Sequence, residues 1–364
     1  MMITKYIIRI SILLSILVVS CIDKIDFEVP AGLSDSIVIQ ARVVKGEISF
    51  VEVDVSRLFD FSVESRRPVS VRRVVLSDDN NNEMVLETRV PGSYFEVLNE
   101  STAIQAEVGR GYKLRVETLD NRIFESTIDI MPPNRIPRGL NLSIVSQPAI
   151  DLLGRATEVD RIRLSIDTEV NTETNGGVFW EISNVYRVTD QGLSDPANPV
   201  IKTCFIEDNI NANEIFILDP TQLRDGNLID HELAFASIDR RFGEGLFFVV
   251  RQFSLSQGAF SYWNGINILS ERGGNIFDGP AGEIPSNFTN INDPESVAFG
   301  YFFATEEELI RRKADLPELA EVLPVCPSDR ACFLPGGDSC VCGLCCDCLN
   351  DPNSTTVVPD FWFD

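Results

Sequence analysis

The chain has 364 residues, of which 55 are acidic, 31 are Lys or Arg and one is His, so its formal net charge is −24. A surface of that sign repels phosphate backbones, which excludes nucleic acids as partners. A single histidine leaves few options for Ser-His-Asp or Cys-His catalysis, and the length predicts about two domains.

The N-terminus predicts export. Lys5 and Arg9 form a short basic region, and residues 10–19 are an almost unbroken apolar run. The run is shorter than the 20 or so residues that span a bilayer, and it has the proportions of a secretory signal. The alternative is a buried core helix. We interpret residues 1–20 as a signal peptide.

The apolar run closes on residues 18–21 (VVSC), which resemble a bacterial lipobox. That resemblance implies cleavage before Cys21 and acylation of this residue, which gives several acyl chains and a permanent anchor. Residues 21–35 would then be a lipidated tether. Ile22 replaces the aspartate that retains lipoproteins in the inner membrane, and residues 23–28 are acidic, as in surface-exported Bacteroidota lipoproteins. We therefore expect an outer-membrane protein, lipid-anchored and facing the cell exterior.

Residues 36–131 are predicted to form an immunoglobulin-like β-sandwich. Short segments that often alternate apolar and polar residues are separated by turn-forming residues, which is typical of antiparallel sandwiches. The predicted strands are 36–43, 49–55, 69–76, 84–88, 93–97, 112–118 and 123–130. Residues 77–83 (SDDNNNE) suit either a calcium loop or a hairpin turn, and the tolerance of Asn and Asp for the left-handed backbone favours the turn.

Residues 132–137 contain three prolines and are predicted to be a linker to a second β-rich domain, 138–325. Its predicted strands are 161–167, 178–188, 214–218 and 246–253. Phe260, Trp263, Ile266 and Leu269 recur at helical spacing and predict one helix that Gly273 and Gly274 end. Residues 305–308 (TEEE) have the form of a capping box and predict a second, short helix.

Residues 326–364 form a cysteine-rich tail. Metal binding, redox chemistry and disulfide bonds all use this residue type, and the spacing within 340–348 would also suit an all-thiolate zinc site. Without Cys21 the cysteines number eight, and in an exported protein an even number favours disulfides. Cys204 is expected to pair with Cys326 or another tail cysteine while the rest pair within the tail, and Asp347 is interpreted as a turn residue. The disulfide candidates are Cys204, Cys326, Cys332, Cys340, Cys342, Cys345, Cys346 and Cys348.

The sequence carries no catalytic signature that we could assign. It has no GxSxG, HExxH or P-loop motif. His231 is interpreted as a satisfied strand or surface histidine. Trp180 and Trp263 could form a sugar-stacking platform, but core packing explains them as well. We expect no catalytic residue, metal or cofactor, and the sequence leaves any ligand unnamed.

Several stretches resemble a Bacteroidota outer-membrane lipoprotein family catalogued as domain of unknown function 4249. They are residues 276–280 (IFDGP), 285–290 (PSNFTN), 298–302 (AFGYF), 345–348 (CCDC) and 359–362 (PDFW), with 91–94 and 111–114 resembling the family's first domain. Cys332, Cys340 and Cys342 depart from the family pattern. The resemblance implies a role beside TonB-dependent receptors and supplies no catalytic residue.

Three functions are compatible with these features. The first is a non-enzymatic accessory or binding partner of a TonB-dependent transporter in nutrient uptake. The second is a cell-surface hydrolase of glycans or peptides, which would place two carboxylates in one aromatic cleft. The third is an architectural or adhesion protein of the envelope, which would present no cleft.

The lipobox makes the first testable prediction. Replacing Cys21→Ser removes the acylation site, so the protein should leave the outer-membrane fraction and appear in soluble fractions, because no acyl chain holds it. Fractionation followed by N-terminal mass analysis measures this. Substituted protein that still sediments with the outer membrane without a lipid would contradict the assignment.

Overall fold

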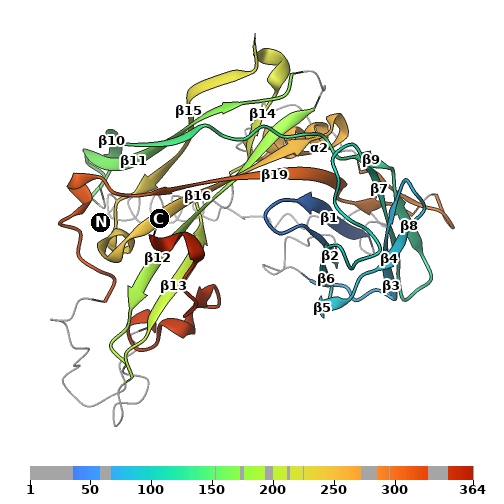
Figure 1. Ribbon diagram of the computed structural model, residues 1–364, viewed down its shortest axis with the longest axis horizontal. Coiled ribbons are helices and arrows are strands. Elements are labelled where there is room, and N and C mark those ends of the chain that lie inside the picture. The colour runs from blue at the N-terminus through green and yellow to red at the C-terminus, as the bar shows by residue number, and fades with distance from the viewer. Residues whose placement is uncertain are drawn as a thin grey trace, which may run out of the picture.

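The computed structural model describes residues 36–57, 67–151, 153–172, 176–192, 200–210, 214–223, 225–271, 284, 286–294, 296–326 and 343–363. In these segments the strands form an 11-stranded, a six-stranded and a three-stranded sheet. The fold is therefore mainly β, as the sequence predicts. Figure 1 shows the strands from the first third of the chain gathered on one side and those from the middle on the other.

The first third holds nine strands. They are β1 (Ile37–Lys45), β2 (Phe50–Arg57), β3 (Arg73–Asp78), β4 (Glu83–Val85), β5 (Thr88–Val90), β6 (Ser93–Val97), β7 (Gly111–Glu117), β8 (Ile123–Ser126) and β9 (Asp129–Ile130). The predicted segments 84–88 and 123–130 each divide into two strands. The other predicted segments each correspond to one strand.

These strands build two sheets around one core. β1, β2 and β6 belong to the large sheet, whereas β8, β7, β3 and β4 are neighbours in the six-stranded sheet. Alternate residues point into the core, so Val43 and Val53 from one sheet join Leu76 and Leu114 from the other, all fully buried. The two-sheet sandwich is observed, and its immunoglobulin-like topology stays a prediction.

The acidic segment between β3 and β4 is a hairpin turn, as predicted. Asn81 has a positive φ of 66°, and the Asp78 carboxylate accepts hydrogen bonds from the backbone N–H groups of Asn80 and Asn82 at 3.0 and 2.9 Å. The Asp78 side chain therefore organises the turn itself.

The middle of the chain adds longer strands and one helix. The elements are β10 (Gly139–Ile150), β11 (Ala156–Glu169), β12 (Gly177–Thr189), β13 (Thr203–Asn209), β14 (Phe216–Leu218), η1 (Pro220–Gln222), β15 (Asn227–Ser237), η2 (Arg240–Glu244), β16 (Leu246–Leu255) and α2 (Gln257–Glu271). The last part contains β17 (Phe288–Asn290), β18 (Ala298–Phe299), β19 (Phe302–Lys313), η3 (Pro317–Leu319), η4 (Gly343–Cys345), η5 (Cys348–Asn350), β20 (Ser354–Thr355) and η6 (Asp360–Phe363).

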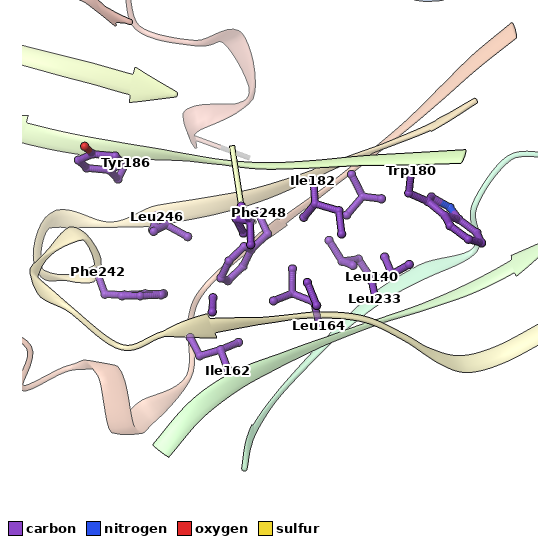
Figure 2. Packing of buried hydrophobic residues seen from close by; sticks show 14 of the residues in the cluster. Leu140, Ile162, Leu164, Trp180, Ile182, Tyr186, Leu233, Phe242, Leu246 and Phe248 are labelled. Atoms are coloured by element: carbon purple, nitrogen blue, oxygen red, sulfur yellow. The ribbon is translucent and has the colours of Figure 1, made fainter. Parts of the chain in front are cut away.

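A second core lies between the large sheet and the three-stranded sheet β10-β11-β15. Figure 2 shows Ile182 and Phe248, from β12 and β16, pointing toward Leu164 and Leu233, from β11 and β15. The even-numbered residues of β12 enter this core, and its odd-numbered residues face the opposite side of the sheet. β12 is covered on both faces and is buried along most of its length, and its apolar residues therefore occupy both odd-numbered and even-numbered positions.

The predicted helix at residues 260–269 is confirmed as α2. The Ser256 hydroxyl oxygen accepts a hydrogen bond from Ala259 N–H at 3.2 Å and so caps the helix start. Phe260 and Trp263 pack on the sheet, where Gly177 leaves room that a Cβ atom would take from the Phe260 ring. Gly273 and Gly274 lie outside the described residues.

The predicted helix at residues 305–308 is wrong. Thr305 and the three glutamates lie inside β19, which pairs with β1 and β16. The capping-box pattern describes only a local preference. Here Thr305 and Glu306 pair with β1, and Glu307 and Glu308 pair with β16. This pairing and the full burial of Thr305 outweigh the local preference.

β19 connects the strands that border the first core with those that border the second, so that both groups belong to one sheet. Its first residues run parallel to β1, with Ala41 opposite Phe302, and its later residues run antiparallel to β16. Figure 1 shows β19 extending from the first group of strands into the second. Just before β19, Gly300 has a φ of 93°, and a Cβ atom there would collide with the Ile39 carbonyl oxygen. The bounds of the predicted domains stay predictions, but strands from both of them share this sheet.

Where β19 changes from β1 to β16, polar side chains make the backbone hydrogen bonds that a neighbouring strand would otherwise make. The backbone N–H and C=O of Phe302 bond to the side chain of Asn287 at 2.9 and 2.8 Å. The N–H of Ala304 donates to Asp129 Oδ2 at 2.8 Å, and the N–H and C=O of Glu306 bond to Ser254 and Asn134 at 3.1 and 2.9 Å. Buried backbone groups of this kind need partners.

The predicted linker is attached to the sheet. Asn134 bonds to Glu306 and Gln252, and the Ser254 hydroxyl donates to the Pro132 carbonyl at 2.7 Å. Residues 132–135 therefore follow the surface formed by β16 and β19.

The Asn287 contact gives a stability prediction. Asn287→Ala leaves the buried N–H and C=O of Phe302 without partners, which should lower the free energy of unfolding by about 2–3 kcal/mol. Urea denaturation measures the change. The matched control is Asn292→Ala, which removes one exposed bond to Asn121 and should cost less than about 0.5 kcal/mol. Equal losses in the two variants would contradict this role for Asn287.

Candidate functional site

The face of the large sheet that points away from the second core carries a band of charged side chains. Arg42, Glu181 and Arg251 lie on β1, β12 and β16, and Glu181 is directly opposite Arg251 in the ladder. Along the strands, an aromatic cluster lies on each side of this band. One is built around Phe179 and Phe253 with α2, and the other around Phe205 and Phe247 with η6.

Arg42 is the central cation of the band. Its Nε donates to Glu52 Oε1 and its Nη1 donates to Glu181 Oε1, both at 2.6 Å. The guanidinium also lies 5.0 Å from the centre of the Phe253 ring and 5.9 Å from that of Phe50. Burial opposes the charge on Arg42, but the carboxylates of Glu181 and Glu52 outweigh burial and raise the pKa of Arg42 above its ordinary value.

Arg251 continues the band toward β13 and β19. It donates to Glu207 Oε1 at 3.0 Å and to the Ser183 hydroxyl at 3.2 Å, and its Nε lies 3.3 Å from Glu307 Oε1. Burial raises the pKa of Glu307 and outweighs the attraction of the nearby guanidinium groups of Arg251 and Arg42. Burial therefore disfavours the charged form of Glu307.

A further ion pair, between Arg311 and Glu47, lies at the end of the band beyond Arg251. Arg311 Nη2 lies 2.7 Å from Glu47 Oε2, and its guanidinium stands over the Phe361 ring at 4.6 Å. The hydrogen bond from Arg311 lowers the pKa of Glu47. The C-terminal aromatic pair is therefore tied to the same charged surface.

The band is hollowed in two adjoining places. The smaller hollow, of about 160 Å³, is lined by Gln40, Ala41, Arg42, Glu52, Asp54, Glu181, Tyr262, Trp263, Tyr301 and Phe303. The larger hollow, of about 460 Å³, is lined by Arg42, Glu47, Ile48, Phe50, Glu181, Glu207, Arg251, Phe253, Glu307, Leu309 and Arg311. Arg42 and Glu181 line both hollows, which therefore adjoin, and we call the two hollows together the sheet groove.

Helix α2 supplies the aromatic wall of the smaller hollow. The Trp263 ring stacks on Phe179 at 5.1 Å, and the Tyr262 ring stacks on Tyr301 at 5.0 Å. The Trp263 Nε1 atom is buried, and no described residue accepts a hydrogen bond from it. The hydroxyl of Tyr262 bonds to the Gln40 side chain, and burial raises the pKa of Tyr262.

The residues PDFW near the C-terminus cover the other end of the band. Trp362 meets Phe205 edge-on at 4.8 Å and lies 5.2 Å from Phe247, and Phe361 lies 5.3 Å from Phe247. Trp362 is buried. This segment therefore packs as part of the fold, and it fixes one limit of the groove.

The other tryptophan and the histidine are core residues. Trp180 is buried, donates from Nε1 to Gln252 Oε1 at 3.0 Å, and packs against the His231 ring at 5.5 Å. His231 is half-buried in β15, and burial lowers its pKa. Core packing therefore explains Trp180, whereas Trp263 lines the groove.

Two disulfide bonds confirm the predicted oxidation of the tail. Cys204 pairs with Cys348, with Cα atoms 5.9 Å apart, and Cys326 pairs with Cys345, with Cα atoms 5.3 Å apart. Cys346 is disulfide-bonded as well. The four sulfur atoms of the two pairs have no thiolate to offer zinc. The other candidates, Cys332, Cys340 and Cys342, lie outside the described residues.

Polar contacts reinforce the attachment of the tail to β12 and β13. The buried Asp190 carboxylate accepts from the backbone N–H groups of Lys202 and Cys348 at 2.8 and 3.1 Å. Lys202 forms an ion pair with Asp347 at 2.8 Å. Asp347 also accepts from Leu349 N–H at 3.0 Å and caps η5, which agrees with its interpretation as a turn residue.

The comparisons with known proteins establish one relationship. The family described as Domain of unknown function (DUF4249) matches residues 22–311, and the chain belongs to that family. Neither a curated protein nor a solved structure matches the chain. The matched range ends inside β19, so the resemblance of the cysteine-rich tail to the family stays a prediction.

Cys21, the predicted lipidation site, lies outside the described residues together with the signal peptide and the tether. Within the segments that the structure describes, no helix combines the length and the apolar character needed to cross a bilayer.

Sequence reasoning missed the sheet groove, although a signal for it exists. Glu181 interrupts the apolar run VFWEI, and Arg251 interrupts the run FFVVRQF. A charge in the middle of a strand that is buried on both faces needs a partner nearby. Two interruptions of opposite sign therefore indicate strands that lie side by side with their charges in register.

The disulfide pairing gives a stability prediction. The Cys204–Cys348 bond closes a separation of 144 residues and the Cys326–Cys345 bond one of 19. In the chain-entropy model these loops are worth about 5 and about 3 kcal/mol. We expect the double variant Cys204→Ala/Cys348→Ala to lose more stability in urea than Cys326→Ala/Cys345→Ala, which serves as its matched control. The reverse order would contradict the assigned anchoring role of Cys204.

Proposed function

We propose that this protein is an outer-membrane lipoprotein, anchored through an acylated Cys21 and facing the cell exterior, that acts as a non-enzymatic binding partner of a TonB-dependent transporter. The observation that carries the binding role is the sheet groove, which is open and is lined by aromatic and aliphatic side chains together with several charged ones. Binding sites commonly combine these features.

The lipobox supports the place of action. Residues 22–35 separate Cys21 from Ser36, the first described residue, and the 15 steps from Cys21 to Ser36 reach about 50 Å when fully extended. A tether of that reach confines the body to the neighbourhood of outer-membrane proteins. Confinement raises the effective concentration of a partner, so a weak contact suffices for a working complex.

The groove also bears on the alternatives. An adhesion protein was expected to present no cleft, and the two hollows favour ligand binding over that alternative. A hydrolase needs two carboxylates with room for the scissile bond between them. Glu52 and Glu181 share one hollow with aromatic residues, which keeps a carboxylate-dependent hydrolase as the second candidate. However, the Arg42 guanidinium bonds to both carboxylates and lies where the substrate would be.

Co-purification from native membranes tests the proposed partnership. Lipid-intact protein isolated in mild detergent should bring with it a β-barrel of the TonB-dependent class, identified by mass spectrometry. The Cys21→Ser variant is the matched control and should recover far less of the barrel, because the tether no longer supplies the high local concentration. Deleting the gene should slow uptake of the transported substrate.

A hydrolytic activity would contradict the proposed binding role. Protein that is recovered without a barrel and hydrolyses glycans or peptides of the cell surface would contradict the proposal and favour the hydrolase. In that case Glu52→Gln and Glu181→Gln should abolish the hydrolysis.

A further inference from the structure

The three-stranded sheet β10-β11-β15 has two edges that differ in charge. β15 forms one edge and carries Asp230, His231 and Glu232, with two irregularities in its pairing with β11 and a positive φ of 51° at Asp230. Charges and bulges of this kind keep an edge strand from pairing with another chain. β10 forms the other edge, and its sequence GLNLSIVSQPAI contains no charged residue. Of the two edges, only β15 is protected by charge.

The absence of charge from β10 departs from the rest of the chain. Charged residues make up 24% of the sequence, so 12 residues would hold about three of them at the average frequency. The other strands that end a sheet in the described part of the chain, β4, β5, β17 and β20, have two or three residues each. β10 is therefore the one long, uncharged edge among the described strands.

The outer side of β10 has backbone groups available for pairing. In an antiparallel pair, alternate residues direct their N–H and C=O groups toward the partner strand and away from it. β10 pairs with β11 along its whole length, and no hydrogen bond joins the groups on its other side to another described residue. A further strand can therefore be added to this edge as far as Pro148, which has no N–H to donate.

The second core is incompletely covered at the same edge. Leu142 and Ile144 of β10 pack against this core and are only partly buried, whereas Leu164 and Ile162, opposite them on β11, are fully buried. A strand added to β10 would cover the exposed part of Leu142 and Ile144. Burial of apolar surface is favourable, so the added strand would gain stability there.

The far end of β10 lacks support from β15. β15 pairs with β11 only from Arg161 onward, so residues 146–150 and 156–160 form a ribbon of two strands beyond it. All five residues of its β11 half are exposed. A two-stranded ribbon is marginally stable by itself in water, and a third strand beside it would stabilise it.

Charge selects a second copy of the chain as the occupant of this edge. A basic partner strand would find acids on β15 and none on β10. A copy of this chain carries the same net charge of −24, so it can approach closely only where no like charges face each other. β10 meets that condition, and a two-fold axis brings two copies of one strand together in antiparallel order.

We propose that two copies of this chain associate through antiparallel pairing of β10 with β10, along residues 139–147 and with the two-fold axis near the middle of that stretch. The pairing joins the two three-stranded sheets into one continuous sheet. It also places the beginning of each β10 beside the first residues of the other copy's ribbon. The inference is independent of the sheet groove and of the proposed transporter.

Sedimentation equilibrium of the full mature chain, in a detergent matched in density to the buffer, tests the pairing. We expect a reversible dimer at micromolar concentration whose dissociation constant falls as salt is raised, because salt screens the repulsion between two acidic bodies. A chain that stays monomeric at these concentrations would overturn the proposal. Loss of a co-purified protein from a β10 variant would then assign the edge to that protein instead.

Charge variants locate the contact. Ser143→Lys/Val145→Lys places like charges opposite each other whichever of residues 143–145 lies on the axis, and should raise the dissociation constant at least about tenfold. The matched control is Ile229→Lys/Ser237→Lys, which adds the same charge at exposed positions of β15 and should dimerise as the native protein does. Equal dissociation constants for the two variants would overturn the assignment to β10.

Mixing two variants separates lost pairing from lost folding. Ser143→Asp/Val145→Asp should also be monomeric, whereas its equimolar mixture with Ser143→Lys/Val145→Lys should form a mixed dimer, because opposite charges then face each other. Circular dichroism checks that each variant is folded. A mixture that stays monomeric while the native chain dimerises would overturn the pairing of β10 with itself.

Discussion

The whole sheet depends on the exchange of partners along β19. This strand lies against β1 through its first residues and against β16 through its later ones. An exchange of this kind leaves buried backbone groups without a strand to bond to, and each unsatisfied group would cost about 1–3 kcal/mol. Asn287 supplies the missing bonds from one segment, and Asp129 and Asn134 supply them from another. Their side chains make one continuous sheet possible.

The continuous sheet in turn creates the groove. Arg42 and Glu181 are 139 residues apart in sequence and bond at 2.6 Å, because β1 and β12 belong to one sheet. Helix α2 and the C-terminal η6 then cover the aromatic residues on either side and leave the charged band open. The disulfide between Cys204 and Cys348 holds the C-terminal region to β13, close to the edge of the same sheet. Segments from the beginning, the middle and the end of the chain thus build one surface.

Local sequence patterns correctly predicted those elements whose formation depends mainly on residues close together in the chain. Alternation located β1, β2 and β6, helical spacing located α2, and the redox environment of an exported protein predicted that Cys204 would pair with the tail. The patterns failed where distant segments decide. Residues 305–308 form a strand because the first two pair with β1 and the last two with β16, which no local preference encodes. β10 was missed because Pro148 and its mixed polarity hide a strand whose pairing with β11 supports it.

Stability alone does not account for the charged band. The side chains of Arg42, Glu52 and Glu181 remain 19%, 37% and 37% exposed, and ion pairs with that much access to water contribute little to folding. Apolar side chains at these positions would extend the two flanking aromatic clusters into one continuous cover. The charged side chains therefore keep an open surface between the two aromatic clusters, and the proposed binding role depends on this surface.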